Sequence, residues 1–287
     1  MNNIKNLFLK SVKVNIQNSK GIDLKKIDIR GSFIRDEVIH RNSDSNFTNI
    51  NSDLIDVKLQ GANLKNANLL LTNLEGANLL FANLEGSNLK SANLKYANLR
   101  RTNMERAILI DTNLNDASFK DSDLEYTKLM GANLENAILT NVDLTGADLT
   151  GADLTGADLT GANLTGANLT DAYLSGSCLK CVYLRDTNLL GADLTGADLT
   201  GAKLINVNLK ESILTGANLS DSYLKNINFR GANLTGANFT RANLNNLNFE
   251  NANLTGIKLT DTFLDKQFTD ELKKQYNPEE QSRVDNI

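Results

Sequence analysis

The stretch from residue 147 to residue 170 reads ADLTGADLTGADLTGANLTGANLT, a unit of five residues repeated almost without change. The same phase extends to both sides, because every fifth residue from Leu54 to Leu264 is large and apolar. These 43 positions hold 38 Leu, four Phe and one Met, and Ala stands two places earlier in 24 cases. So short and strict a period predicts a repeat architecture in which each unit contacts only its neighbours.

A period of five residues excludes a long α-helix and a continuous strand. A helix would spread the Leu over all of its faces, and a strand would place successive Leu on opposite sides. The pattern closes only if each unit makes a short extended stretch and then a corner. Ala and Leu then point inward, and the Asn or Asp between them points outward. The fifth position suits a corner with positive φ, because it holds Gly or one of the residues that tolerate this conformation, as at Asn66, Asp116, Asp121 and Asn136.

The unit Ala-(Asn/Asp)-Leu-x-x resembles the motif of the pentapeptide-repeat family over residues 52–264. The resemblance implies an all-β fold, a right-handed quadrilateral β-helix (a solenoid) with four units in each coil. Residues twenty apart would then stack, and the rod would be about 50 Å long at roughly 4.8 Å per coil. The rings of Phe229 and Phe249 should therefore lie on each other, with Phe239 facing them across the core. Larger residues in the Ala position should widen or fill the section locally, at Val142, Val207, Ile227, Leu247 and Ile257.

Three segments outside the repeats follow other patterns. Residues 1–34 contain apolar pairs two apart and are expected to form an N-terminal cap or irregular coils. Residues 35–51 are polar, which predicts either a loop or a distorted coil. Residues 265–287 place apolar side chains at helical spacing, which predicts a short C-terminal capping helix followed by a tail. The same helix could join two copies, so a monomer and a dimer both stay open.

Charge and composition restrict the classes of partner. The chain carries a net charge of −4, and residues 52–264 hold 17 basic and 23 acidic side chains. This mixture argues against direct binding of nucleic acid, which needs a basic surface. The sequence contains no stretch long and apolar enough for a membrane span, and its first residues are too polar for a secretion signal. We therefore expect a cytoplasmic protein that does not bind membranes.

The residue types needed for catalysis do not converge in this pattern. Cys178 and Cys181 form a C-x-x-C pair, but zinc would need two further ligands, and the single His, His40, is far away in sequence. The carboxylates of one coil would point away from one another on four faces: Asp143, Asp148, Asp153 and Asp158. We therefore expect no enzyme activity, no cofactor and no metal site.

Departures from the motif mark the candidate binding surfaces. Positions expected to face water hold Leu70, Ile108, Ile110 and Met130, with Lys90 between them. Further apolar residues stand outward or at corners in the same part of the chain, at Leu71, Leu80, Phe81, Tyr96 and Tyr126. Contiguous exposed apolar surface indicates a partner site more often than a catalytic one. The segment 70–130 is therefore the first candidate for protein binding.

A second departure lies farther along the chain. Tyr183, Lys203 and Tyr223 are twenty residues apart, so they should stack in one column, where the Lys ammonium could sit over a Tyr ring. A third column holds hydroxyl side chains, at Thr155, Ser175, Thr195, Thr215, Thr235 and Thr255. Such a Thr ladder could bind ice, although Tyr173 and Ile213 should project from the same face.

The sequence thus favours a non-enzymatic interaction protein, a rod-like scaffold that binds a protein partner through its exposed faces. The resemblance implies one alternative, because some pentapeptide-repeat proteins mimic DNA and bind type II topoisomerases such as DNA gyrase, which gives quinolone resistance. Ice binding through the Thr ladder is a third possibility. The sequence does not identify the partner.

Overall fold

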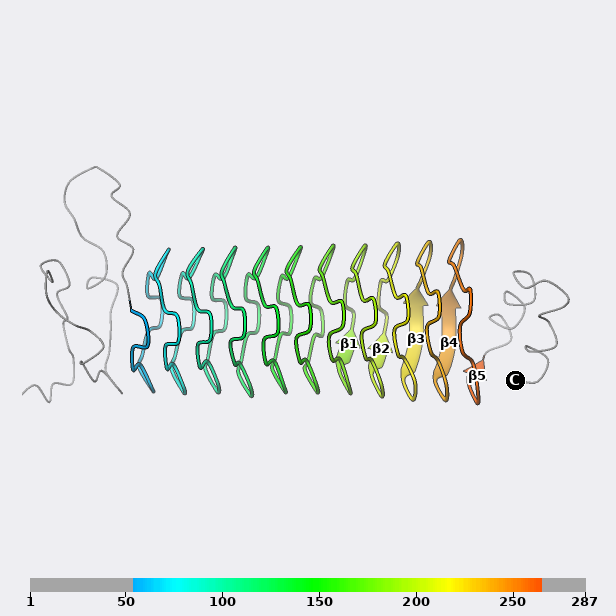
Figure 1. Ribbon diagram of the computed structural model, residues 1–287, viewed down its shortest axis with the longest axis horizontal. Coiled ribbons are helices and arrows are strands. Elements are labelled where there is room, and N and C mark those ends of the chain that lie inside the picture. Colours follow the sequence, from blue (N-terminus) through cyan, green and yellow to red (C-terminus); the bar gives the residue numbers. More distant parts are fainter. Residues whose placement is uncertain (1–53, 265–287) are drawn as a thin grey trace, which may run out of the picture.

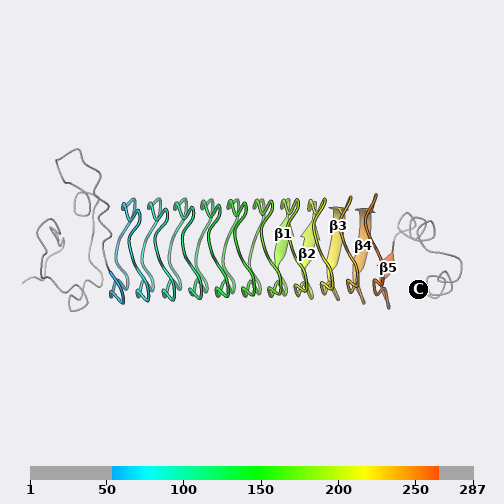
Figure 2. The same ribbon diagram turned by 45° about the horizontal axis from the view of Figure 1, so that its top comes forward.

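The computed structural model describes residues 54–264, which form one elongated rod (Figures 1 and 2). The predicted cap at 1–34, the loop or coil at 35–51, and the C-terminal helix and tail at 265–287 lie outside the described residues. No helix within 54–264 is long and apolar enough to cross a membrane.

Each coil contains twenty residues, as four units per coil require. The backbone N–H of Leu64 donates to the carbonyl of Asn83 at 2.7 Å, and the N–H of Asn83 donates to Ala62 at 2.9 Å. Residues twenty apart are therefore paired in parallel, for example Asn63 with Asn83. We number the four faces by their inward Leu columns: the first face contains Leu54, the second Leu59, the third Leu64 and the fourth Leu69, each continuing every twenty residues.

The longer strands all lie on the third face. They are β1 (Tyr183–Arg185), β2 (Lys203–Ile205), β3 (Tyr223–Asn228), β4 (Asn243–Asn248) and β5 (Phe263–Leu264). They form one parallel sheet in the order β1-β2-β3-β4-β5, with a register of twenty residues (Figure 1). β3 and β4 continue through the corner to the fourth face. There Ile227 and Leu247 stand in place of Ala, and these larger side chains need a wider coil.

The corners have the conformation that the fifth position predicts. The N–H of Ala62 donates to the carbonyl of Leu59 at 2.9 Å across a four-residue turn, and the third residue, Gly61, has φ 67°. The φ angles of Asn66 (58°), Asp116 (57°), Asp121 (59°) and Asn136 (56°) are also left-handed, which confirms the prediction. Side-chain chemistry therefore sets where the chain bends.

The outward Asn or Asp of each unit also holds its corner. The backbone N–H of Thr145 donates to Oδ1 of Asp143 at 3.0 Å, two residues earlier, and this bond recurs around the coil at Asp148, Asp153 and Asp158. A short carboxylate or amide that bonds two residues ahead imitates a backbone turn. These four carboxylates point to four faces as predicted, and each is used by its own corner.

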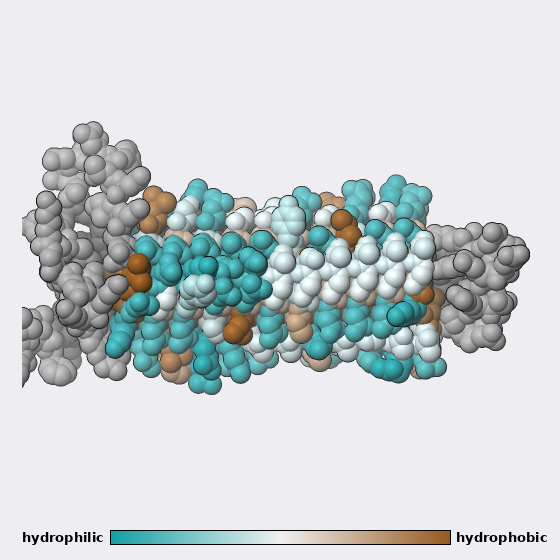
Figure 3. Space-filling model, viewed as in Figure 1, coloured by the Kyte–Doolittle hydropathy of each residue, from teal (hydrophilic) through white to brown (hydrophobic). Residues whose placement is uncertain are grey.

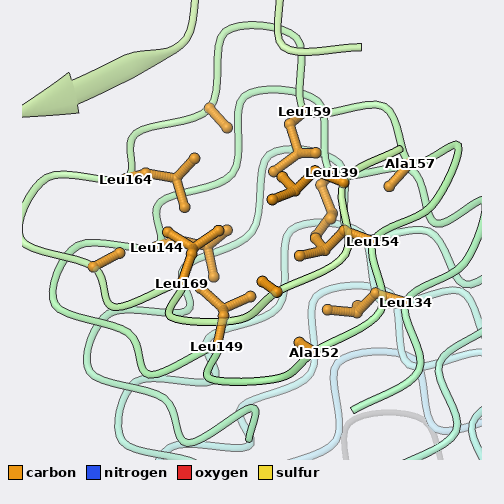
Figure 4. Close-up of a cluster of buried hydrophobic side chains, with 14 of the residues drawn as sticks. Leu134, Leu139, Leu144, Leu149, Ala152, Leu154, Ala157, Leu159, Leu164 and Leu169 are labelled. Atoms are coloured by element: carbon orange, nitrogen blue, oxygen red, sulfur yellow. The ribbon is translucent and has the colours of Figure 1, made fainter. Parts of the chain in front are cut away.

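The core consists of the inward Leu and Ala columns. Leu149, Leu154 and Ala152 are fully buried, and Figure 4 shows such side chains converging on the axis of the rod. The rings of Phe229 and Phe249 stack at 5.1 Å between centroids with 9° between planes, and Phe239 meets Phe229 edge-on at 6.5 Å and 89°. This arrangement confirms the prediction from the spacing of the three Phe.

Residues other than Ala in the small position are also accommodated inside the rod. Val142, Val207, Ile227 and Leu247 are buried, and Ile257 is partly buried against the same core. Polar residues in this position bond to the coil: the hydroxyl of Thr112 donates to the carbonyl of Leu89 at 2.9 Å, and that of Ser122 to Leu99 at 2.6 Å.

Ser87 departs from this rule, because its Oγ is buried and has no hydrogen-bond partner within residues 54–264. A buried unpaired hydroxyl costs about 1–3 kcal/mol, and Ala is the usual residue in this position. We therefore expect Ser87→Ala to raise the free energy of unfolding by about 1 kcal/mol in a urea titration. Ser122→Ala is the matched variant, and it should lower this free energy, since its hydroxyl is paired. Equal effects of the two substitutions would contradict the prediction.

Candidate partner-binding surface

The left-handed corner positions are unusual in one part of the rod. Across residues 54–264, ten corner residues with positive φ are neither Gly, Asn nor Asp. Seven of them fall between residues 71 and 126: Leu71, Phe81, Ser91, Tyr96, Arg101, Arg106 and Tyr126. The other three are spread over the rest of the rod. The residues that fit this conformation least are therefore concentrated in one segment.

Four of these corner residues are large and apolar, and each stands on a different edge of the rod. Their exposed fractions are 40% for Leu71, 51% for Phe81, 55% for Tyr96 and 50% for Tyr126. A left-handed backbone costs an L-residue about 1–2 kcal/mol, and exposed apolar rings recover little of this by burial. We call the segment from residue 70 to residue 130 the belt. Sequence reasoning had marked these four residues as off-motif, but not their conformation.

Each aromatic corner of the belt is accompanied by a cation. The guanidinium of Arg101 lies 5.6 Å from the ring centroid of Phe81, and that of Arg106 lies 5.6 Å from the Tyr126 ring. The ammonium of Lys95 lies 4.7 Å from the centroid of Tyr96, and side-chain hydrogen bonding with Tyr96 raises the pKa of Lys95. The belt therefore exposes rings and positive charges together, on more than one edge.

The predicted patch lies on the fourth face, inside the belt. Leu70, Ile108, Ile110 and Met130 are half-buried, and Lys90 is exposed between them. Backbone bonds from Leu71 to Lys90, from Ser91 to Ile110 and from Asp111 to Met130 tie the neighbouring coils together here. The structure therefore brings the predicted residues onto one face.

A shallow groove of about 470 Å³ opens at the edge between the third and fourth faces, lined by Arg106, Ile108, Tyr126 and Lys128. Its walls are apolar at Ile108 and Tyr126 and cationic at Arg106 and Lys128. Sequence reasoning missed both cations, because the candidate residues were the apolar departures from the motif. The twenty-residue register contains a signal for both cations. Arg106 stands one coil before Tyr126, and Lys128 stands one coil after Ile108.

The third face bears the opposite charge beside this groove. Glu85, Glu105 and Glu125 stand in one column, with Asp123 and Asp143 in the next one. Partial burial raises the pKa of Glu125, and the charges of Asp143, Asp123 and Glu105 raise it further. An acidic ridge therefore borders the cationic groove.

The raised pKa of Glu125 predicts how the stability of the protein should change with pH. A carboxyl whose pKa is higher in the folded state than in the unfolded state opposes folding when it is ionised, and the penalty disappears as pH falls below its ordinary value. We expect Glu125→Gln to raise the melting temperature slightly at neutral pH. The difference from the original protein should shrink as pH falls from the raised folded-state pKa to the ordinary value of 4.5, and it should be absent at lower pH. A difference that grows in acid would contradict this account.

The second predicted column is present but separate from the belt. Lys203 pairs in register with Tyr183 and Tyr223, on β1, β2 and β3. Its ammonium lies 4.9 Å from the centroid of the Tyr183 ring and 3.4 Å from the Tyr183 hydroxyl, as the sequence predicted. The column continues to the exposed ring of Phe263. The nearest ring, Tyr183, is about three coils from the groove, so the two surfaces are distinct.

The Thr ladder lies on the first face, with Tyr173 and Ile213 exposed in the adjacent column. The hydroxyls of Thr195, Thr235 and Thr255 donate to the outward residue two places earlier, at 2.6 to 2.7 Å. In Figure 3, hydrophilic residues crowd the half of the visible side nearer residue 54, and a pale stripe of intermediate hydropathy runs along the other half. Ice binding stays an untested prediction, and three of the six ladder hydroxyls are already bonded within their own coils.

The two thiols lie at the surface. Cys178 is half-buried with its Sγ 3.2 Å from the Thr160 hydroxyl, Cys181 is an exposed corner, and Leu179 between them is buried. Within residues 54–264 there is no group of three His, Cys, Asp or Glu side chains that could hold a metal ion.

Comparison with known proteins gives the family. A family model described as pentapeptide repeats matches residues 52–90, 87–125, 127–166, 167–204, 192–231 and 222–261. The chain is a pentapeptide repeat protein. Membership gives the coil a right-handed winding. No curated protein matches the sequence significantly.

Solved structures of other pentapeptide repeat proteins are similar to this one. HetL from the cyanobacterium Nostoc sp. strain PCC 7120, which is involved in the regulation of heterocyst differentiation, is 30% identical. That match covers 77% of this chain and 90% of HetL, with a TM-score of 0.59. The fluoroquinolone resistance protein QnrB1 is 18% identical, over 78% of this chain and 96% of QnrB1, with a TM-score of 0.28. A pentapeptide repeat protein of the Arabidopsis thaliana thylakoid lumen is 33% identical over 42% of this chain and 77% of its own length, with a TM-score of 0.19.

Proposed function

We propose that this pentapeptide repeat protein is a non-enzymatic scaffold that binds a protein partner through the belt. The observation that carries the proposal is the set of large apolar residues at left-handed, exposed corners. Backbone strain of this kind persists where function requires the side chain. The rest of the rod shows that Gly, Asn or Asp would satisfy the same corners without strain. The proposal includes a cytoplasmic location, which the sequence predicts.

The fourth face is the part of the belt best suited to a partner. It combines half-buried apolar side chains with a groove, and aromatic residues near cations are enriched in the centres of protein interfaces. The sheet beneath is rigid because every coil is bonded to the next one. A rigid surface loses little conformational entropy when it binds.

Mimicry of DNA is supported less well by the charges. Several carboxylates are neutralised by cations of a neighbouring coil, as in Lys65–Glu85 at 2.8 Å, Arg230–Glu250 at 3.6 Å and Arg241–Asp221 at 2.6 Å. A surface that imitates a phosphate backbone needs carboxylates free to meet the partner's cations. Binding to gyrase therefore remains an alternative prediction from the family resemblance, behind a partner that recognises the belt.

The test replaces apolar residues of the belt by charge. We expect Ile110→Asp together with Met130→Asp to abolish capture of the partner from an extract of the source cells, because a buried unpaired carboxylate opposes association. Leu190→Asp is the matched control, since Leu190 is a half-buried residue in the same column, farther along the same face. Circular dichroism should be unchanged for both proteins. Equal capture by the belt variant and the control would refute the proposal.

A further inference from the structure

The cations of the fourth face fall into two groups. In the part beyond the belt, Lys210 pairs with Glu211 at 3.1 Å and Arg230 pairs with Glu250 at 3.6 Å. In the belt, Lys90 and Lys128 have no carboxylate of residues 54–264 within ion-pair distance. Lys90 and Lys128 are thus unpaired within this range, although Asp148 follows Lys128 in the same column, and Arg106 at the edge of this face is paired with Glu105.

The open cations flank apolar surface. Ile110 lies in the same column as Lys90, one coil farther on, and Ile108 precedes Lys128 in the next column. The groove between Tyr126 and Ile108 opens beside these two columns, with Arg106 at its edge. An occupant therefore needs an apolar side chain for the groove and negative charge on both sides of it.

The acidic ridge restricts how such an occupant can lie. Glu125 borders the groove on the third face and would repel carboxylates placed there, whereas the charge of Glu105 is paired with Arg106. The negative charges of the occupant must therefore stay on the fourth face, along the axis of the rod. Lys90 and Lys128 are about two coils apart, roughly 10 Å, which is about three residues of an extended peptide.

We propose that the belt receives an extended acidic peptide segment of its partner, with carboxylates about three residues apart that meet Lys90 and Lys128 and an aromatic or aliphatic side chain that fills the groove. This inference rests on the proposed function and specifies the chemistry of the partner. A nucleic acid fits less well, because it needs an array of cations without apolar residues between them. A membrane also fits less well, because the aliphatic side chains of this face, Ile108, Ile110 and Met130, are half-buried.

The test measures fluorescence anisotropy of short labelled peptides with the full chain. The probe peptide carries two Glu three positions apart with a Phe between them, and three comparison peptides replace both Glu by Gln, replace both by Lys, or place them side by side. We expect the probe peptide to bind about tenfold more tightly than each comparison peptide at low salt, a difference of about 1.4 kcal/mol. Its affinity should fall as salt rises, because the contacts are partly exposed.

Variants of the protein locate the site. Lys128→Glu should weaken binding of the probe peptide about tenfold or more, whereas Lys210→Glu on the same face should leave it unchanged. The proposal is overturned if the Gln peptide binds as tightly as the probe, if both substitutions act equally, or if only phosphatidylserine vesicles bind and the probe peptide does not. If the peptides fail while Ile110→Asp with Met130→Asp still abolishes partner capture, the belt remains the interface and only its acidic specificity is wrong. If the probe binds at Lys128 while that pair leaves capture unchanged, the proposed function fails instead.

Discussion

Replacing Phe229 by Ala is expected to lower the free energy of unfolding by about 3–5 kcal/mol, the usual cost of removing a large buried aromatic side chain. Phe229 is fully buried, stacks on Phe249 at 5.1 Å and meets Phe239 edge-on at 6.5 Å. The substitution therefore removes its burial and two ring contacts at once. Because each coil packs only against its neighbours, the lost packing is concentrated near the C-terminal end of the rod.

Phe229→Leu is the control for this prediction. Leu occupies the equivalent position in most units, so it restores apolar volume and loses mainly the ring contacts, at a cost of about 1.5 kcal/mol or less. Urea denaturation followed by circular dichroism measures both variants. Hydrogen exchange should also show faster opening around residues 209–249 than around Leu154 in the Ala variant. Equal stability of the Ala and Leu variants would show that the three Phe are not packed as described.

The second large effect concerns the belt, and it has opposite signs for stability and binding. We expect the combined substitutions Phe81→Asn, Tyr96→Asn and Tyr126→Asn to keep or raise stability while they weaken partner binding, because Tyr126 lines the groove beside the fourth face. Asn tolerates the left-handed conformation, whose cost to other residues is about 1–2 kcal/mol each. The cation–ring contacts that are lost contribute about 0.5–1 kcal/mol each at exposed sites. The first effect is the larger one, so the sum should be a gain of about 1–3 kcal/mol.

Three further corners supply the control for the combined variant. Asp171, Asn206 and Asn251 are left-handed corners without bulky residues. Substituting Tyr at these three positions should lower stability by a comparable amount and leave partner capture intact. Thermal unfolding and pull-down measure the two quantities separately. A marked loss of stability in the Asn variant would mean that the aromatic corners stabilise the fold. They would then no longer indicate that the belt binds a partner.

The two predicted effects assign stability and binding to different parts of one rod. The buried Leu, Ala and Phe columns provide stability that depends little on the surface. The corners can therefore carry strained residues at a tolerable cost, because a few kcal/mol are small beside the packing of many coils. Because strained corners are concentrated between residues 71 and 126, most of the rest of the rod serves as a support for the belt.

The five-residue period by itself determined the architecture. It fixed which side chains are buried, which residues stack at intervals of twenty, where the corners bend, and how Phe229, Phe239 and Phe249 pack. Prediction succeeded here because each unit is specified by its own few residues and by its neighbours one coil away. The predicted columns of Leu70 to Met130 and of Tyr183 to Tyr223 followed from the same rule.

Only the tertiary structure decided the features that depend on contacts both between coils and across corners. It showed that Arg106 and Lys128 line a groove with Tyr126 and Ile108, although neither cation is an apolar departure from the motif. It also showed that Lys210 and Arg230 are paired while Lys90 and Lys128 are not, because pairing depends on side-chain reach across coils and corners. The physical reason is that backbone periodicity sets the position of every residue in a repeat, whereas charge pairing and grooves arise from the shapes of particular side chains that the period does not constrain.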